Sequence, residues 1–159
     1  FVFVGRGSEA KKLQQQAQTL GLNNVLFFDE IEPEEIPGLY AQCHVGLIAL
    51  DPKHKTHNIP GKFLSYMQAG MPVLASINPG NDLAEIITSA GVGCACSNAD
   101  VDELVRAAMR LRETLAVDGD GVRRRCHALA AQMFSTQAAV EQIVSALTGC
   151  TGALKRSQC

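Results

Sequence analysis

The chain has 159 residues, which is enough for one compact domain with a sizeable hydrophobic core. Hydrophobic residues make up 47% and charged residues 19%, a balance typical of a domain that folds in water. The formal net charge of −2 gives no basic field that would attract nucleic acid or anionic lipid. No apolar run approaches the roughly 20 residues that a membrane-spanning helix needs. We therefore expect a globular domain without a nucleic-acid partner.

Six cysteines are spread along the chain, and none of them forms a Cys-x-x-Cys pair. Most lie in apolar segments, as expected of buried thiols in a reducing compartment. Cys94 and Cys96 share one face of an expected strand, but no neighbouring side chains complete a zinc tetrad. The sequence therefore predicts no bound metal ion.

Short apolar runs alternate with segments of helical periodicity over the first two thirds of the chain. The runs predict strands at residues 1–4, 25–28, 45–50, 72–76 and 92–97. The periodic segments predict helices at residues 8–20, 33–42, 61–69, 82–90 and 100–115. Ser8 and Asp100 are the expected N-caps, and Gly21 and Gly91 are the expected helix stops. The alternation predicts an α/β fold with a Rossmann-like parallel sheet and helices on both faces.

Beyond residue 97 the pattern changes to helices alone. Residues 118–121 predict a break in the chain, followed by helices at 122–133 and 136–147. Residues 148–159 show little periodicity, and we expect this tail to be partly disordered. The sequence thus predicts one domain at residues 1–147 and a short tail.

The segment 58–81 holds the strongest candidate for a binding site. It combines a helix start, a buried strand and a glycine-containing loop, and phosphorylated ligands bind where such features meet at a sheet's carboxyl edge. The first backbone N–H groups of the helix, at Gly61, Lys62 and Phe63, are expected to point at the ligand. Lys62 adds a positive charge suited to phosphate, and Ser65 shares its face of the helix.

Two other loops lie between an expected strand and a helix. Arg6 lies between two glycines after the first strand and can face the same ligand, although the third glycine of a dinucleotide fingerprint is missing. Gly80 and Asn81 follow the fourth strand, where Asn81 and Asp82 can bond ligand hydroxyls. Asp82 is also the expected N-cap of the next helix, with Glu85 at the capping-box position.

The loop before this helix carries a small basic cluster of Lys53, His54, Lys55 and His57. Its His-x-x-His spacing has no third ligand, so we expect no metal there. A lid that helps to hold negative charge and a merely solvated loop both fit the pattern.

These residues belong to a longer string that resembles the C-terminal, donor-binding half of GT-B glycosyltransferases of the large retaining family 4. The matching segments are FVFVGRGSE, NNVLFFDEI, LYAQCHVGLIAL, PGKFLSYMQAGMPVLAS and NPGNDLAEII, in the family's order. The string is most similar to a bacterial subgroup that acts in surface-polysaccharide and lipopolysaccharide assembly.

The resemblance implies transfer of a hexosyl group from a nucleoside diphosphate sugar to an acceptor hydroxyl, with retained anomeric configuration. It implies no metal or other cofactor, and it assigns no catalytic residue here. Together with the motifs above, it gives the expected donor contacts as Arg6, Gly61, Lys62 and Phe63 for the diphosphate, Ser65 for the ribose, Glu30 and Ile31 for the base, and Gly80 and Asn81 for the sugar.

The sequence departs from the family's pattern in two places. Many members carry two glutamates seven residues apart, the second of which holds the ribose; here these positions are Asn58 and Ser65. A serine can bond one ribose hydroxyl but cannot act as a bidentate carboxylate. The family's first strand and helix of this domain, and its acceptor domain, would precede Phe1, and that strand is central in a 3-2-1-4-5-6 sheet. We therefore expect the 159 residues alone to be inactive in transfer.

Two alternatives stay open from the sequence. Ser65 favours a non-catalytic nucleotide-sugar-binding or regulatory domain, and a GT-B-like nucleotide-sugar epimerase would use the same scaffold. The expected partners are a nucleotide-sugar donor and an N-terminal acceptor domain. The expected location is cytoplasmic, with peripheral contact to the inner membrane through the acceptor domain.

Overall fold

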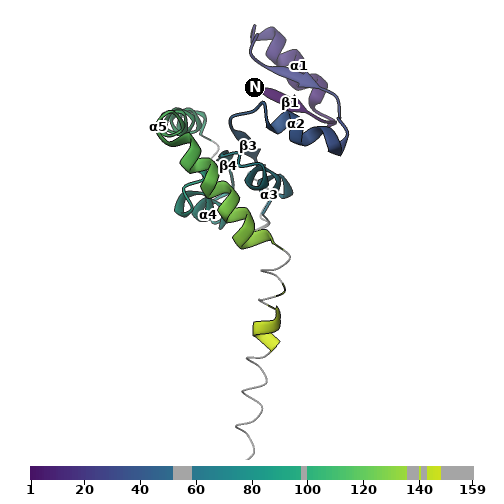
Figure 1. The fold of residues 1–159 in the computed structure, drawn as a ribbon. Coiled ribbons are helices and arrows are strands. Elements are labelled where there is room, and N and C mark those ends of the chain that lie inside the picture. The colour runs from purple at the N-terminus through teal and green to yellow at the C-terminus, as the bar shows by residue number, and fades with distance from the viewer. Residues whose placement is uncertain (52–58, 98–99, 136–139, 141–142, 148–159) are drawn as a thin grey trace, which may run out of the picture. The chain divides into compact units, whose positions relative to one another are not determined.

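The computed structural model describes residues 1–51, 59–97, 100–135, 140 and 143–147 (Figure 1). The chain divides into two units, Phe1–Leu39 and Tyr40–Cys159. The first unit has a two-stranded parallel sheet and the second a three-stranded parallel sheet.

The first unit is a β-α-β motif followed by short helical turns. Its strands pair in parallel with Val2 opposite Leu26, and the rings of Phe3 and Phe27 stack with their centroids 5.2 Å apart. Gly21 has a φ of +65° and ends the helix, as predicted. The elements are β1 (Val2–Val4), α1 (Ala10–Thr19), β2 (Leu26–Phe28), the 3-10 turn η1 (Pro33–Glu35) and α2 (Ile36–Tyr40).

Two details of this unit differ from the prediction. Ser8 does not cap α1; Glu9 holds the N-cap position without a side-chain cap bond, because the Gly7 carbonyl already accepts the Ala10 N–H in a preceding turn. The predicted helix at 33–42 is split, since a reciprocal capping box between Glu32 and Glu35 favours a separate 3-10 turn at its start.

The second unit is built on three parallel strands in the order β3-β4-β5. In register, Gly46, Val73 and Gly93 lie side by side at one end of the sheet, and Ala49 and Ser76 pair at the other. The strands therefore end at one common edge. The elements are β3 (Gly46–Ala49), α3 (Gly61–Gln68), β4 (Val73–Ser76), α4 (Leu83–Ser89), β5 (Gly93–Cys96) and α5 (Val101–Phe134).

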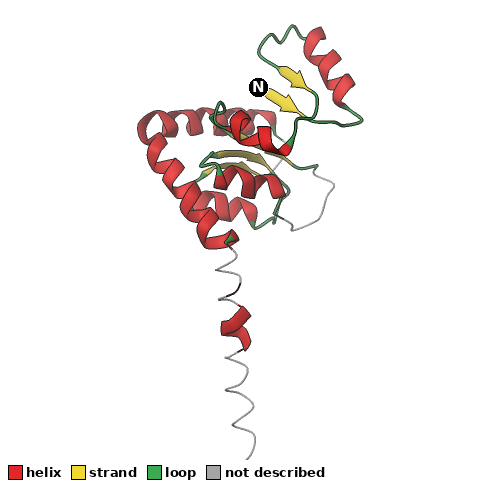
Figure 2. Ribbon diagram, turned by 45° about the vertical axis from the view of Figure 1, so that its right-hand side comes forward, coloured by secondary structure: helices red, strands yellow, loops and turns green. Residues whose placement is uncertain are grey.

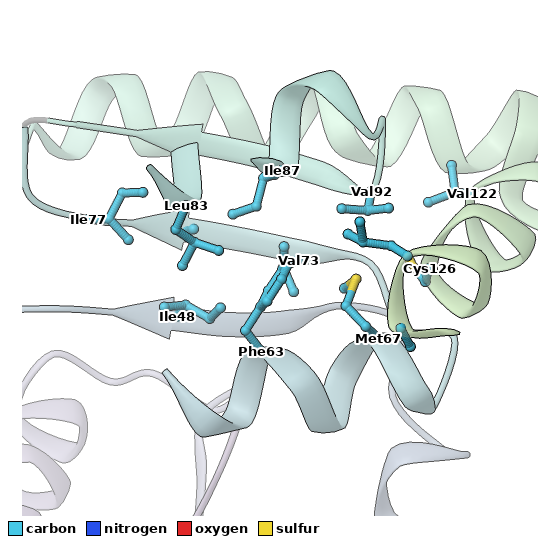
Figure 3. Packing of buried hydrophobic residues seen from close by; sticks show 13 residues of the cluster. Ile48, Phe63, Met67, Val73, Ile77, Leu83, Ile87, Val92, Val122 and Cys126 are labelled. Carbon is cyan, nitrogen blue, oxygen red and sulfur yellow. The ribbon is translucent and has the colours of Figure 1, made fainter. Parts of the chain in front are cut away.

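Alternate side chains of the sheet enter two hydrophobic clusters. The first contains Val73 and Ala75 and is covered by α3 and α4 (Figure 3). The second contains Leu74 and Cys96 and is covered by the first half of α5. Helices thus cover both faces of the sheet, as Figure 2 shows. The fully buried side chains include Ile48, Phe63, Met67, Leu83, Ile87 and Val92.

Helix α5 reaches both clusters because it kinks at Asp118, where φ is −137° and ψ is 41°. Leu111 packs in the second cluster before the kink, and Val122 and Cys126 pack in the first cluster after it. Leu115, just before the kink, contacts both. The helix therefore joins the two faces of the sheet.

A polar contact fixes this kink. The Arg125 side chain donates from Nε to the Gly91 carbonyl at 3.0 Å and from Nη1 to Asp118 Oδ2 at 2.9 Å. An added Cβ at Gly121 would overlap the Asp118 carboxylate, so this side chain would have to move from its present position. The predicted break at 118–121 is thus confirmed as a kink at Asp118, where two helical segments meet. The expected helix at 136–147 lies partly, and the tail at 148–159 wholly, outside the described residues.

The predicted class is confirmed: parallel strands alternate with helices that lie on both faces of the sheet. Asp100 caps α5 by accepting the N–H groups of Asp102 and Glu103, and Gly91, with φ of +61°, follows α4, as predicted.

Among the described helices, none has both the length and the apolar character needed to cross a membrane.

The contact between β4 and β5 gives a stability prediction. An added Cβ at Gly93 would overlap the backbone carbonyl of Val73, which cannot move without breaking the ladder. We expect Gly93→Ala to lower the free energy of unfolding by about 3 kcal/mol in urea denaturation. Gly119→Ala is the control, because no atom lies within 4 Å of its added Cβ, and its change should stay within about 0.5 kcal/mol. Equal midpoints for the two variants would contradict the packing described here.

Candidate functional site at the carboxyl edge of the sheet

The carboxyl edge of the β3-β4-β5 sheet brings together two of the predicted binding segments. Helix α3 follows β3 and helix α4 follows β4, and both run back along the sheet. In Figure 3, Phe63 near the start of α3 and Leu83 at the start of α4 lie toward the end at which the strands finish. The α3 start and the β4–α4 loop therefore belong to one edge of the second unit.

The N-terminus of α3 presents fewer free amides than the sequence suggested. Pro60 is the N-cap, with extended backbone angles, and the helix begins at Gly61. The Phe63 N–H donates to the Pro60 carbonyl at 2.9 Å, and the Phe63 ring is fully buried in the first cluster. The expected diphosphate contact of Phe63 stays a prediction, for an N–H that already makes this bond. The amides of Gly61 and Lys62 form no hydrogen bond with any residue that the structure describes.

Lys62 and Ser65 lie on the outer side of α3, away from the buried Phe63 and Met67. Lys62 is exposed, and it forms no ion pair within the described part of the chain. The Ser65 hydroxyl donates to the Gly61 carbonyl one turn earlier, at 3.5 Å. This contact is at the long limit for a hydrogen bond, so the hydroxyl can exchange it for another partner.

Asn81 is the most distinctive polar residue of this edge, because its side chain is only 6% exposed. Its Oδ1 accepts the N–H of Leu83 at 2.9 Å, an Asx turn that caps α4. Since a backbone N–H can only donate, the atom facing it is the oxygen, and the amide orientation is fixed. The Nδ2 group is then buried and has no hydrogen-bond partner among the described residues.

The predicted N-cap position of Asp82 is confirmed, but its side chain is not the one that caps α4. Asp82 occupies the N-cap position by backbone geometry, but its side chain accepts no cap bond, and it is exposed. Asn81 is better placed because its Oδ1 reaches Leu83 while its own N–H closes a turn on the Asn78 carbonyl at 3.3 Å. Gly80, with φ of +78°, gives the turn a conformation that side chains disfavour.

The predicted base-binding and arginine residues lie in the first unit. Arg6 follows β1 and Glu30 follows β2, and their side chains form an ion pair. Ile31, the next residue, is half-buried. The sequence assigned Arg6 and Glu30 to different parts of the donor, whereas the structure brings the two charges together.

Burial raises the pKa of three side chains in the two hydrophobic clusters. The Tyr66 hydroxyl, on α3, donates to the Leu47 carbonyl at 3.4 Å, and burial raises the pKa of Tyr66 to about 12. Burial also raises the pKa of the Cys126 thiol to about 11 and that of Cys96 above its ordinary value. Both thiols are buried, as predicted, and at neutral pH all three groups stay protonated.

Some predicted features cannot be placed. Lys53, His54, Lys55, His57 and Asn58 lie outside the described residues. Within the described part of the chain, no three His, Cys, Asp or Glu side chains are grouped as metal ligands would be.

The family model of the glycosyl transferases group 1 matches residues 1–114, which include both sheets and the start of α5. The chain belongs to this family. A search of curated proteins finds no match to it. The family confirms the predicted glycosyltransferase domain of the GT-B type.

The sequence did not predict two features of this group 1 domain. The first is the capping role of Asn81, which the Asn-x-Leu spacing before α4 could have suggested, because asparagine commonly bonds the N–H two residues on. The second is the Arg6–Glu30 pair. The sequence could have suggested this pair, because Arg6 and Glu30 each lie two residues beyond the end of a strand and the two strands are neighbours.

The assignment of the α4 cap predicts different effects for neighbouring residues. Asn81→Ala should have a free energy of unfolding about 1 kcal/mol below that of Asn81→Asp, because both variants lose Nδ2 and only the alanine also loses the bond to the Leu83 N–H. Asp82→Ala is the matched control and should change it by less than about 0.5 kcal/mol, since the Asp82 side chain makes no cap bond. Urea denaturation measures both. A larger loss for Asp82→Ala would show that the aspartate is the cap after all.

Proposed function

We propose that the chain binds a nucleoside diphosphate sugar at this edge and serves as the donor half of a retaining glycosyltransferase. The buried and unpartnered Nδ2 of Asn81 carries this proposal. Leaving a buried donor without a partner costs about 1–3 kcal/mol, a cost that a ligand acceptor would remove. The family supports a sugar donor as that ligand.

The α3 start is suited to the diphosphate of such a donor. The amides of Gly61 and Lys62, which bond no described residue, and the positive end of the helix dipole favour a negatively charged group. The charge of Lys62, which forms no ion pair in the described part of the chain, adds to this effect. When the bond between the sugar and the diphosphate breaks, negative charge grows on the departing phosphate. Donors already in place stabilise it without further reorganisation.

The β4–α4 loop is suited to the sugar. Asn81 Nδ2 would donate to a hydroxyl or carbonyl oxygen of the sugar, and the glycine conformation at Gly80 lets the backbone approach it closely. Since Asn81 is held by its own bond to Leu83, it loses little side-chain entropy on binding. The loop therefore offers a preorganised contact.

We extend the proposal to the partners that the resemblance implies. The acceptor hydroxyl would be held by a second α/β domain, so the 159 residues alone would bind the donor without completing transfer. The site uses amides and a lysine to balance the diphosphate, and we propose that it needs no metal ion. The products would belong to surface polysaccharide or lipopolysaccharide, made in the cytoplasm or at the inner face of the membrane.

Lys62 gives the direct test of donor binding. We expect Lys62→Ala to weaken the binding of a nucleoside diphosphate about ten-fold, or about 1.4 kcal/mol, in titration calorimetry with the uridine, guanosine, adenosine, cytidine and thymidine compounds. Arg112→Ala removes the same charge from α5, about three turns from its start, and should leave the affinity unchanged. If none of the five diphosphates binds the wild-type chain, the proposal is wrong.

Ser65 tests where the ribose lies. Ser65→Glu adds a carboxylate that can accept both ribose hydroxyls, and we expect affinity for the preferred diphosphate to rise about five-fold. The 2′,3′-dideoxy form of the same diphosphate is the control, because it lacks those hydroxyls and should gain nothing. If the affinities for both compounds change equally, or neither changes, the ribose does not lie at Ser65.

A further inference from the structure

The ring of Tyr66, on α3, lies directly against the backbone of Gly46 at the start of β3. A Cβ added at Gly46 would lie 2.7 Å from Tyr66 Cγ and closer still to Cδ2 of the ring. Two carbon atoms in contact need about 3.5 Å, so any side chain at this position would overlap the ring. The lack of a side chain at Gly46 therefore allows α3 to approach β3 this closely.

Two further contacts hold the ring over Gly46. The Tyr66 hydroxyl donates to the Leu47 carbonyl at 3.4 Å, and the Tyr40 ring packs edge to face against the Tyr66 ring, with the centroids 5.3 Å apart. All of these residues lie in the second unit. The contact with Gly46 reaches Tyr66 Cγ, which only Cβ separates from the backbone of α3. A group inserted at Gly46 would therefore displace the helix and not the ring alone.

The Tyr66 contact contributes to the direction of α3. Phe63 and Met67 hold the inner face of the helix in the first cluster (Figure 3), and Tyr66 supports its flank on β3. A helix of eight residues moves as one body, so a wider spacing at Tyr66 would tilt it about Phe63. The N–H groups of a helix point along its axis toward its start. A tilt would therefore turn the amides of Gly61 and Lys62.

We propose that Tyr66, through its contact with Gly46, is a positioning residue for the binding of phosphate at the α3 start. Its side chain touches no ligand, and it acts by setting the direction of the amides of Gly61 and Lys62. This inference rests on the proposed function. It makes phosphate affinity depend on a contact at the end of the sheet opposite the binding edge.

A paired substitution at Gly46 and Tyr66 tests this role. Gly46→Ala forces a methyl group between β3 and the ring, and we expect it to weaken binding of the preferred nucleoside diphosphate about five-fold in titration calorimetry, as expected when an anion loses its contact with a helix start. Adding Tyr66→Leu removes the ring and nearly conserves the summed volume of the two residues. The double variant should therefore return to within about two-fold of the wild-type affinity.

Two controls separate positioning from stability and from direct contact. Gly93→Ala also forces a methyl group into the sheet, but the atoms nearest its added Cβ all belong to Val73, so its affinity should equal that of the wild type. Tyr66→Phe keeps the ring and loses only the hydroxyl bond to the Leu47 carbonyl, and it should bind within about two-fold of the wild type. Circular dichroism and urea denaturation show whether each variant is folded.

Several results would overturn the inference while leaving the proposed function intact. They are wild-type affinity in Gly46→Ala, no recovery in the double variant, and a loss in Gly93→Ala or Tyr66→Phe as large as that in Gly46→Ala. If Gly46→Ala does not fold, Tyr66→Leu alone takes its place; it should bind about three-fold more weakly because α3 loses its support on β3, and unchanged affinity overturns the inference. If the wild-type chain binds no nucleoside diphosphate, the proposed function itself fails, and this inference with it.

Discussion

The parallel pairing of β4 with both β3 and β5 is the interaction on which the rest of the second unit depends. Because the strands run in one direction, the chain must return along a helix after each of them, and α3 and α4 both start at the same edge. The buried Phe63 and Leu83 fix these helices to the sheet immediately after they begin. The start of α3, whose Gly61 and Lys62 amides bond no described residue, is thus held on the sheet.

At this edge one residue, Asn81, both caps a helix and carries the group on which the proposed binding rests. Asn81 stabilises α4 with its oxygen and leaves its nitrogen buried without a partner. A residue with only the capping role could be an exposed aspartate, as Asp82 is, at no cost in buried polar groups. Away from this edge, the Arg125 side chain bonds the Gly91 carbonyl and the Asp118 carboxylate at the kink of α5.

The regular parts of this fold follow from local patterns. Apolar runs predict each strand to within two residues, and Gly21, Gly91 and Asp100 act as the sequence indicates, because their roles depend on backbone angles or on a neighbouring N–H. The predictions that fail concern choices between nearby residues. Ser8 and Glu9 compete for one cap, and Asp82 and Asn81 for another, and packing of the whole helix decides between them.

Long-range contacts account for the remaining differences. The bend of α5 at Asp118 brings the helix against two separate hydrophobic clusters, so the sequence predicts the break but not its direction. Sequence alone does not show that the Phe63 N–H bonds the Pro60 carbonyl. It assigns the candidate site residues to loops and helix starts, but it does not show which of their atoms are already bonded.

The central claim is that the α3 start and Asn81 bind one ligand. A heteronuclear NMR titration of the chain with its preferred nucleoside diphosphate sugar tests this most directly. The account predicts that the backbone amides of Gly61 and Lys62 and the side-chain NH₂ of Asn81 shift together, with one dissociation constant, while the Phe63 amide shifts less because it is already bonded. Saturable binding that leaves the Asn81 NH₂ signal unmoved would contradict it.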